Sequence, residues 1–401
     1  CMGSADMASY SGAPGPGNEF GATPGGIQDM GLARELIENG RVPPPEAFVV
    51  EGMFSEHDLP LQGPRCDRVL CVRGAMGTAP DEDDIDSTWL QVGFSSTIDQ
   101  DAFERPSLTV VGTVDISGSM TGTPLSVSKA MLNALVDELG PEDRFGLVTY
   151  GSEARTVLEI TPVTDRDRLH DVINSLDNAG STNMEAGLDL AFRHAIHDDG
   201  DTEQRRVWVF TDVQPNVGAT SGTEFERMAA TAADQGVGLT VFGAGLGIGQ
   251  EVLVAMSHLR GGNAFSLFEL DDVGDLMDES WPWMVSPIAY DMELDVTPSS
   301  GLALAEAYGI PASDGSTASL DVSTIFLSRK RGGILLKFVA WSRDMVEGAL
   351  TADIVLRYRT PEGEDVEERI NPSMVPTNDG PSFQQPSVHK SVALAVLVSS
   401  M

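Results

Sequence analysis

The sequence contains few basic residues and very little cysteine. Its 401 residues include 25 Lys and Arg against 61 Asp and Glu, which gives a formal net charge of −36. The lysines are Lys129, Lys330, Lys337 and Lys390. An acidic field of this size repels phosphate groups. The composition therefore argues against nucleic acid and anionic lipid headgroups as ligands.

Long apolar runs are also missing, and no stretch is long enough to span a bilayer. The hydrophobic content of 41% is still sufficient to bury a core, and the length predicts two or three domains. The cysteines are Cys1, Cys66 and Cys71. A disulfide between the last two requires a turn, because an extended strand would hold them too far apart. The sequence leaves that bond open.

The chain begins with cysteine, followed by a segment rich in Gly, Pro, Ala and Ser over residues 1–28. This order is typical of mature bacterial lipoproteins, in which the cysteine carries lipid and a flexible tether follows. We therefore expect a protein anchored in the bacterial cell envelope through a lipid on Cys1, either periplasmic or surface-exposed. An arbitrary start is the alternative.

Strands and helices alternate over residues 107–285, and the strands are nearly continuous apolar runs. This pattern predicts an α/β fold with a doubly wound, mainly parallel sheet covered on both faces. Residues 29–106 and 286–372 contain strand-like segments separated by turns. They predict an antiparallel β-sandwich into which the α/β domain is inserted. Residues 373–401 predict a linker and a helix.

Oxygen-bearing side chains occur where ligands bind in such sheets, at the carboxyl ends of the strands. Asp115 ends one strand and is followed by Ser117 and Ser119, Thr182 precedes a helix, and Asp212 ends another strand. Oxygen ligands alone suit a hard cation, Mg²⁺ foremost, with Mn²⁺ or Ca²⁺ as alternatives. The competing interpretations are an Asx turn at Asp115 and a helix cap at Thr182.

The segments "DISGSM", "GSTNMEAGL" and "FTDVQPNVG" resemble the metal-ion-dependent adhesion site of von Willebrand factor type A domains. The resemblance covers residues 107–285, and the flanking segments are similar to those of a bacterial envelope subgroup. It implies a Mg²⁺ ion held by Asp115, Ser117, Ser119, Thr182 and Asp212. It also implies an open coordination position that an Asp or Glu of a partner protein fills. Val213 departs from the family pattern, where many members have glycine.

We therefore expect a metal-dependent protein-binding module for adhesion or envelope assembly, with no catalytic residues and no organic cofactor. One alternative is a structural lipoprotein whose metal only stabilises the fold. The other is a Mg²⁺-dependent hydrolase, which is disfavoured because Ser117 stands where such sites usually place a second carboxylate. "GAGLGIGQ" indicates a tight turn rather than a dinucleotide site. The oligomeric state is left open.

Overall fold

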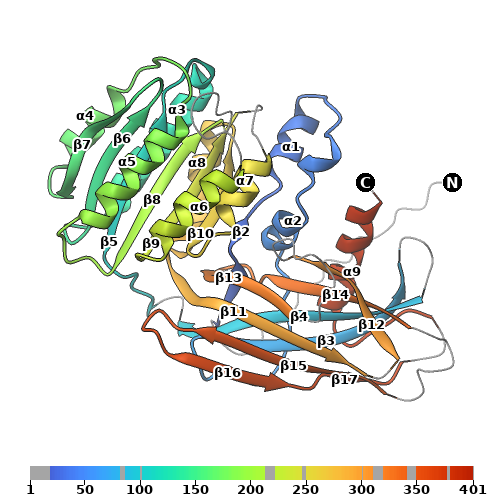
Figure 1. The fold of residues 1–401 in the computed structure, drawn as a ribbon. Helices are drawn as coiled ribbons and strands as arrows, with labels where there is room; N and C mark the ends of the chain where they lie inside the picture. The colour runs from blue at the N-terminus through green and yellow to red at the C-terminus, as the bar shows by residue number, and fades with distance from the viewer. Residues whose placement is uncertain are drawn as a thin grey trace.

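The computed structural model describes residues 19–81, 86–99, 102–212, 222–245, 250–299, 301–309, 319–340, 349–376 and 380–400. Within these ranges the chain forms two β-sheets (Figure 1), one of seven strands and one of eleven. The seven-stranded sheet belongs to the α/β domain, and the eleven-stranded sheet forms a separate β domain below it in the view.

The seven-stranded sheet has the order β2-β10-β9-β8-β5-β6-β7. Its strands are β2 (Gly26–Ile27), β5 (Leu108–Asp115), β6 (Arg144–Tyr150), β7 (Ala154–Pro162), β8 (Gln204–Thr211), β9 (Val237–Ala244) and β10 (Gly262–Leu267). All neighbours run parallel except β6 and β7. Every residue of the central strand β5 is buried, which explains its largely apolar sequence. The predicted doubly wound sheet is confirmed.

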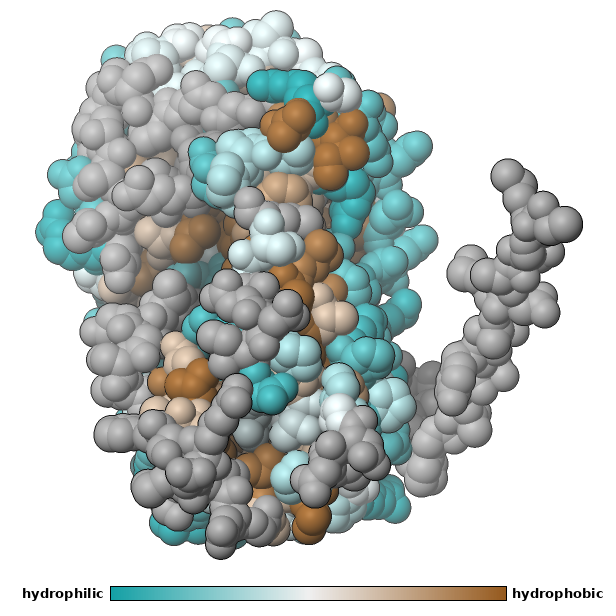
Figure 2. Space-filling model, turned by 90° about the vertical axis from the view of Figure 1, so that its right-hand side faces the viewer, coloured by the Kyte–Doolittle hydropathy of each residue, from teal (hydrophilic) through white to brown (hydrophobic). Residues whose placement is uncertain are grey.

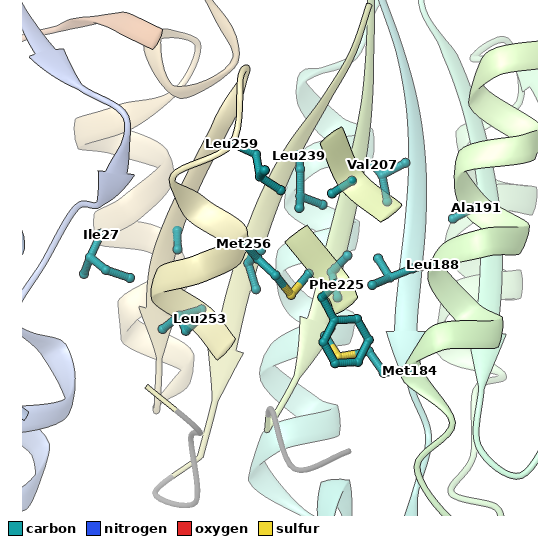
Figure 3. Packing of buried hydrophobic residues seen from close by; sticks show 14 of the residues in the cluster. Ile27, Met184, Leu188, Ala191, Val207, Phe225, Leu239, Leu253, Met256 and Leu259 are labelled. Atoms are coloured by element: carbon teal, nitrogen blue, oxygen red, sulfur yellow. The ribbon is translucent and has the colours of Figure 1, made fainter. Parts of the chain in front are cut away.

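Helices cover both faces of this sheet. The helices are α3 (Thr123–Glu138), α4 (Arg166–Asn174), α5 (Met184–His197), α6 (Gly222–Ala233), α7 (Gln250–Ser257) and α8 (Leu270–Ser280). Apolar residues of α3, α4 and α8 share one buried cluster with the sheet. Apolar residues of α5, α6 and α7 belong to a second buried cluster on the other face of the sheet. Figure 3 shows part of this cluster around Phe225 and Leu188.

The eleven-stranded sheet is antiparallel. Its main path is β12-β14-β4-β1-β13-β11-β15-β16, with β3 on β4, β18 on β3 and β17 on β15. The strands are β1 (Glu19–Pro24), β3 (Cys71–Pro80), β4 (Asp86–Asp99), β11 (Pro287–Pro298), β12 (Leu302–Tyr308), β13 (Ser319–Ser328), β14 (Gly333–Ala340), β15 (Leu350–Arg359), β16 (Asp365–Ile370), β17 (Ser373–Met374) and β18 (Ser382–Phe383). Strands from before and after the α/β segment pair with one another, and their apolar side chains form one core. The α/β domain is therefore inserted into a sandwich-like β domain.

The predicted tether over residues 1–28 is wrong for its last part. Residues 19–24 form β1 in the β domain, and residues 26–27 form β2 at the edge of the α/β sheet. The glycines here allow close packing: a Cβ on Gly21 would lie 2.6 Å from the Arg331 backbone, and one on Gly25 would lie 2.5 Å from Gly262 O. Residues 1–18, including Cys1, lie outside the described residues.

Three further helices lie beside the two sheets: α1 (Gly31–Glu38), α2 (Val50–Glu56) and α9 (Pro386–Ser399). Figure 2 views the molecule from this side, where hydrophobic residues form separate areas between hydrophilic ones. The predicted C-terminal helix is confirmed as α9. Within the described ranges, no helix combines the length and the apolar character needed to cross a bilayer.

Cys66 and Cys71 form a disulfide, with their Cα atoms 5.7 Å apart. The segment between them leads into β3, and the backbone bends over residues 68–70, which supplies the turn that the short separation requires.

A buried interface joins the two domains. Arg206 of β8 is 2% exposed, donates hydrogen bonds to Gly261 O and Asn263 Oδ1, and lies over the Phe326 ring of β13 at 5.4 Å. Nearby, Gly261 N donates to Thr324 Oγ1 of the β domain at 2.6 Å. These contacts attach the β domain to the amino-terminal ends of the α/β strands, at the edge opposite their carboxyl ends.

Candidate metal centre

Asp115 is the last residue of β5, the central strand of the parallel sheet. Its side chain is fully buried. Oδ1 accepts a hydrogen bond from Ser117 N at 2.8 Å, and Oδ2 accepts one from Thr211 Oγ1 at 3.1 Å. Asp115 therefore makes the Asx-type turn contact that the sequence offered as an alternative to metal binding, and this contact fixes the carboxylate at the sheet edge.

The two serines lie on the turn that follows β5. Ser117 is 2% exposed, Ser119 is exposed, and their hydroxyl oxygens are 3.1 Å apart. Ser119 lies in a short 3-10 helix, η3 (Gly118–Met120). Neither serine caps helix α3, whose N-cap is Gly122 and has no side-chain hydrogen bond. Both hydroxyls therefore lie at the same sheet edge as Asp115, one buried and one at the rim.

A second loop, residues 176–183, is bound directly to this turn. Asn178 Nδ2 donates to Ser117 O at 2.9 Å, and Gly118 N donates to Gly180 O at 3.3 Å. Thr182 belongs to this loop, two residues after Gly180, and is 1% exposed. The cap of helix α5 is Asn183, whose Oδ1 accepts a hydrogen bond from Ala186 N at 3.2 Å. The capping interpretation of Thr182 is therefore wrong.

Asp212 directly follows β8, the strand that pairs with β5. It is 4% exposed, and its Oδ1 has no hydrogen-bond partner among the residues that the structure describes. A buried carboxylate oxygen without a partner is energetically costly. The chain continues into residues 213–221, so Val213 lies outside the described residues.

Burial and neighbouring groups perturb the Asp115 carboxylate. Burial raises the pKa of Asp115 to about 6; hydrogen bonds from Ser117 act against this increase, and the charge of Asp212 adds to it. In the described part of the chain, no ion pair joins either carboxylate to a basic side chain. Two buried acids without a counter-ion form an environment that a cation would stabilise.

The donor set consists of oxygen atoms from two carboxylates and three hydroxyls. No group of three or more His, Cys, Asp or Glu side chains suited to a metal occurs in the described ranges. A cation at this edge would thus depend on the hydroxyls of Ser117, Ser119 and Thr182. Such neutral oxygen ligands fit Mg²⁺, Mn²⁺ or Ca²⁺ better than a metal that prefers nitrogen or sulfur.

Two residues close to these carboxylates were not predicted from the sequence. Thr211 donates to Asp115, and Tyr150 at the end of β6 is fully buried beside Asp115 in the strand register. The signal that could have identified both is their position at the end of a strand that neighbours a predicted ligand strand.

A cavity of about 430 Å³ lies elsewhere, between α1, α8 and β13, and is lined by Asp29, Leu276 and Phe326 among others. None of the predicted metal ligands lines it. The oxygen cluster at the sheet edge and this cavity are therefore separate features.

Comparisons with known proteins agree with this fold. Residues 110–279 match the sequence profile of the von Willebrand factor type A domain. YfbK of Escherichia coli K12, an uncharacterised protein, is 26% identical over 275 residues, which cover 66% of this chain and 47% of YfbK. Inter-alpha-trypsin inhibitor heavy chain H1 of Mesocricetus auratus is 25% identical over 208 residues, which cover 50% of this chain and 23% of that protein. The chain therefore spans less than half the length of either relative.

The likeness extends to a solved structure, the von Willebrand factor type A from Catenulispora acidiphila. It aligns with a TM-score of 0.50 at 12% identity, covering 80% of this chain and 76% of the other. At this identity the likeness shows the fold alone. Taken with the profile match, it establishes that residues 110–279 of this chain form a von Willebrand factor type A (VWA) domain.

Proposed function

We propose that the VWA domain binds a divalent cation, Mg²⁺ foremost, and uses it to bind an acidic side chain of a partner protein. The residues that would hold the ion are Asp115, Ser117, Ser119, Thr182 and Asp212. The observation that carries the proposal is the buried Asp212 Oδ1, which has no hydrogen-bond partner among the described residues. A cation beside it would satisfy this oxygen and relieve the repulsion between Asp212 and Asp115.

The donor set also supports a role in binding. When present, the ion would have five protein side chains around it, fewer than the six or more oxygen ligands that such cations take, so it could accept a further carboxylate oxygen. Ser119 is exposed whereas Asp115 is fully buried, so the site can be approached from the rim side of the turn. A protein-borne Asp or Glu is the ligand that fits this arrangement.

The direct test is calorimetric titration of Mg²⁺ into the metal-stripped protein, beside Asp115→Ala and Asp199→Ala. Asp199 is a suitable control because its side chain is 99% exposed and precedes β8 at the opposite end of the strand. We expect saturable one-site binding by the wild type and Asp199→Ala, and none by Asp115→Ala. Equal binding by all three would show that the acidic surface takes up Mg²⁺ non-specifically and would contradict the proposal.

A binding function predicts more than metal uptake. Asp115→Ala should remain folded, by circular dichroism, and lose its partner. If the variant keeps its partner, the metal only stabilises the fold and the structural alternative holds. If the loaded wild type hydrolyses a phosphate ester and Asp115→Ala does not, the hydrolase alternative holds.

A further inference from the structure

A second buried polar atom lies beside the candidate metal ligands. Tyr150 ends β6 and pairs in register with Asp115 of β5, so its side chain extends from the same face of the sheet. The residue is fully buried, and its hydroxyl has no hydrogen bond of ordinary geometry to any described residue. Among the described residues, Tyr150 Oη and Asp212 Oδ1 are thus both buried without a hydrogen bond of ordinary geometry, although the Thr211 side chain lies close enough to the phenol to interact with it.

The aromatic ring of Tyr150 is held in place by helix α5. A Cβ on Gly187 would lie 2.3 Å from Tyr150 Cδ1 and 2.9 Å from its Cβ. The absence of a side chain at Gly187 therefore lets the helix backbone lie directly against the ring. Because α5 begins at Met184, just after Thr182, the loop that carries Thr182 and the ring of Tyr150 are held by the same helix.

The phenol can supply a hydrogen-bond donor to this site. A tyrosine hydroxyl is protonated at neutral pH and donates through its O–H group. The strand register places Tyr150 next to Asp115, and the Thr211 hydroxyl also lies near the phenol.

We propose that Tyr150 is a positioning residue for the metal site: its hydroxyl donates a hydrogen bond to Asp212, directly or through one water, when a cation is bound. The inference rests on the proposed metal binding. A hydrogen bond to a ligating carboxylate fixes the orientation of that ligand and strengthens metal binding. The alternative is that the tyrosine serves only as an aromatic core residue, in which case phenylalanine would replace it without effect on the metal.

The test compares Tyr150→Phe with Tyr358→Phe, in the metal-free protein and in titrations with Mg²⁺ alone. Tyr358 is also buried, but its hydroxyl donates to Leu70 O at 3.1 Å in the β domain. We expect Tyr150→Phe to leave the metal-free melting temperature unchanged or raised, because it removes no satisfied hydrogen bond. Its Mg²⁺ affinity should fall by about 10- to 100-fold. Tyr358→Phe should show the reverse, with a lower melting temperature and unchanged affinity.

The outcomes separate this inference from the proposed function. If the wild type and Tyr150→Phe bind Mg²⁺ equally, the positioning role is overturned and the metal site stands. If Tyr150→Phe melts as early as Tyr358→Phe without metal, the hydroxyl already has a structural partner and the inference is also overturned. If the wild type binds no Mg²⁺ at all, both proposals fail.

Discussion

Replacing Gly187 by alanine tests the close packing of α5 on Tyr150. The new Cβ would lie 2.3 Å from one ring carbon and 2.6 Å from another, and the ring cannot move aside because Tyr150 is fully buried. Overpacking of this kind costs about 1–3 kcal/mol, and contacts this short place it near the upper end. Alanine regains about 1 kcal/mol through its higher helix propensity. The net loss in free energy of unfolding should be about 2 kcal/mol.

The same substitution at Gly274 provides the control. Gly274 lies in α8, is exposed, and a Cβ there would meet no atom within 4 Å. Gly274→Ala should therefore gain about 1 kcal/mol from helix propensity alone. For a domain of this size, 1 kcal/mol shifts the melting temperature by about 2–4 °C. Gly187→Ala should melt about 4–8 °C lower than the wild type and Gly274→Ala slightly higher, by calorimetry. Equal melting temperatures for the two variants would refute the packing argument.

Three further predictions concern charge. Asp115→Asn should abolish Mg²⁺ binding yet raise the metal-free stability at pH 7 by up to about 3 kcal/mol, because burial raises the pKa of Asp115 to about 6 and disfavours the ionised form. This gain in stability should vanish below pH 4. Urea unfolding at both pH values measures it, and no gain at pH 7 would contradict the prediction. At Asp58, hydrogen bonds from Arg331 outweigh burial and lower the pKa, so the folded protein gains stability from this carboxylate above its ordinary pKa and loses it as pH falls. Asp58→Asn should accordingly cost up to about 1 kcal/mol at pH 7 and nothing in strong acid, since the pair is half-exposed; an equal cost at both pH values would contradict the ion pair. Finally, the net charge of −36 should repel an acidic partner. Added salt should therefore strengthen binding at first, because it screens charges separated by more than a Debye length, about 10 Å at 0.1 M. A steady loss of affinity with salt would argue against an acidic ligand.

The features that the sequence revealed are those with local signals. The buried strand β5 and the oxygens that follow it belong to one short segment, and parallel strands align their carboxyl ends regardless of the loops between them. Asp115 at the end of β5 and Asp212 just after β8 therefore lie at the same edge of the sheet, as this rule predicts.

The features that the sequence concealed depend on distant residues. The Gly-rich composition before residue 28 predicted a tether. That prediction failed because no local signal in the sequence shows that Gly21 packs on Arg331 or that Gly25 packs on Gly262. Tyr150 reads as one more apolar residue of a buried strand, and its place beside Asp115 follows only from the register of β5 with β6. Composition cannot distinguish a glycine that gives freedom from one that allows close approach.

The passage of the N-terminal segment between the two sheets has a mechanical consequence. β1 pairs with β4 and β13, and β2, one residue later, pairs with β10 at the edge of the VWA sheet opposite β7. The inserted VWA domain is thus joined to the β domain at that edge, in addition to the two points where its chain enters and leaves it. A pulling force on the strand carboxyl ends would be shared among several strands instead of loading a single linker. The VWA domain would then hold the sheet edge that carries the candidate metal ligands at a fixed angle to the β domain, and would not rotate about a single flexible connection.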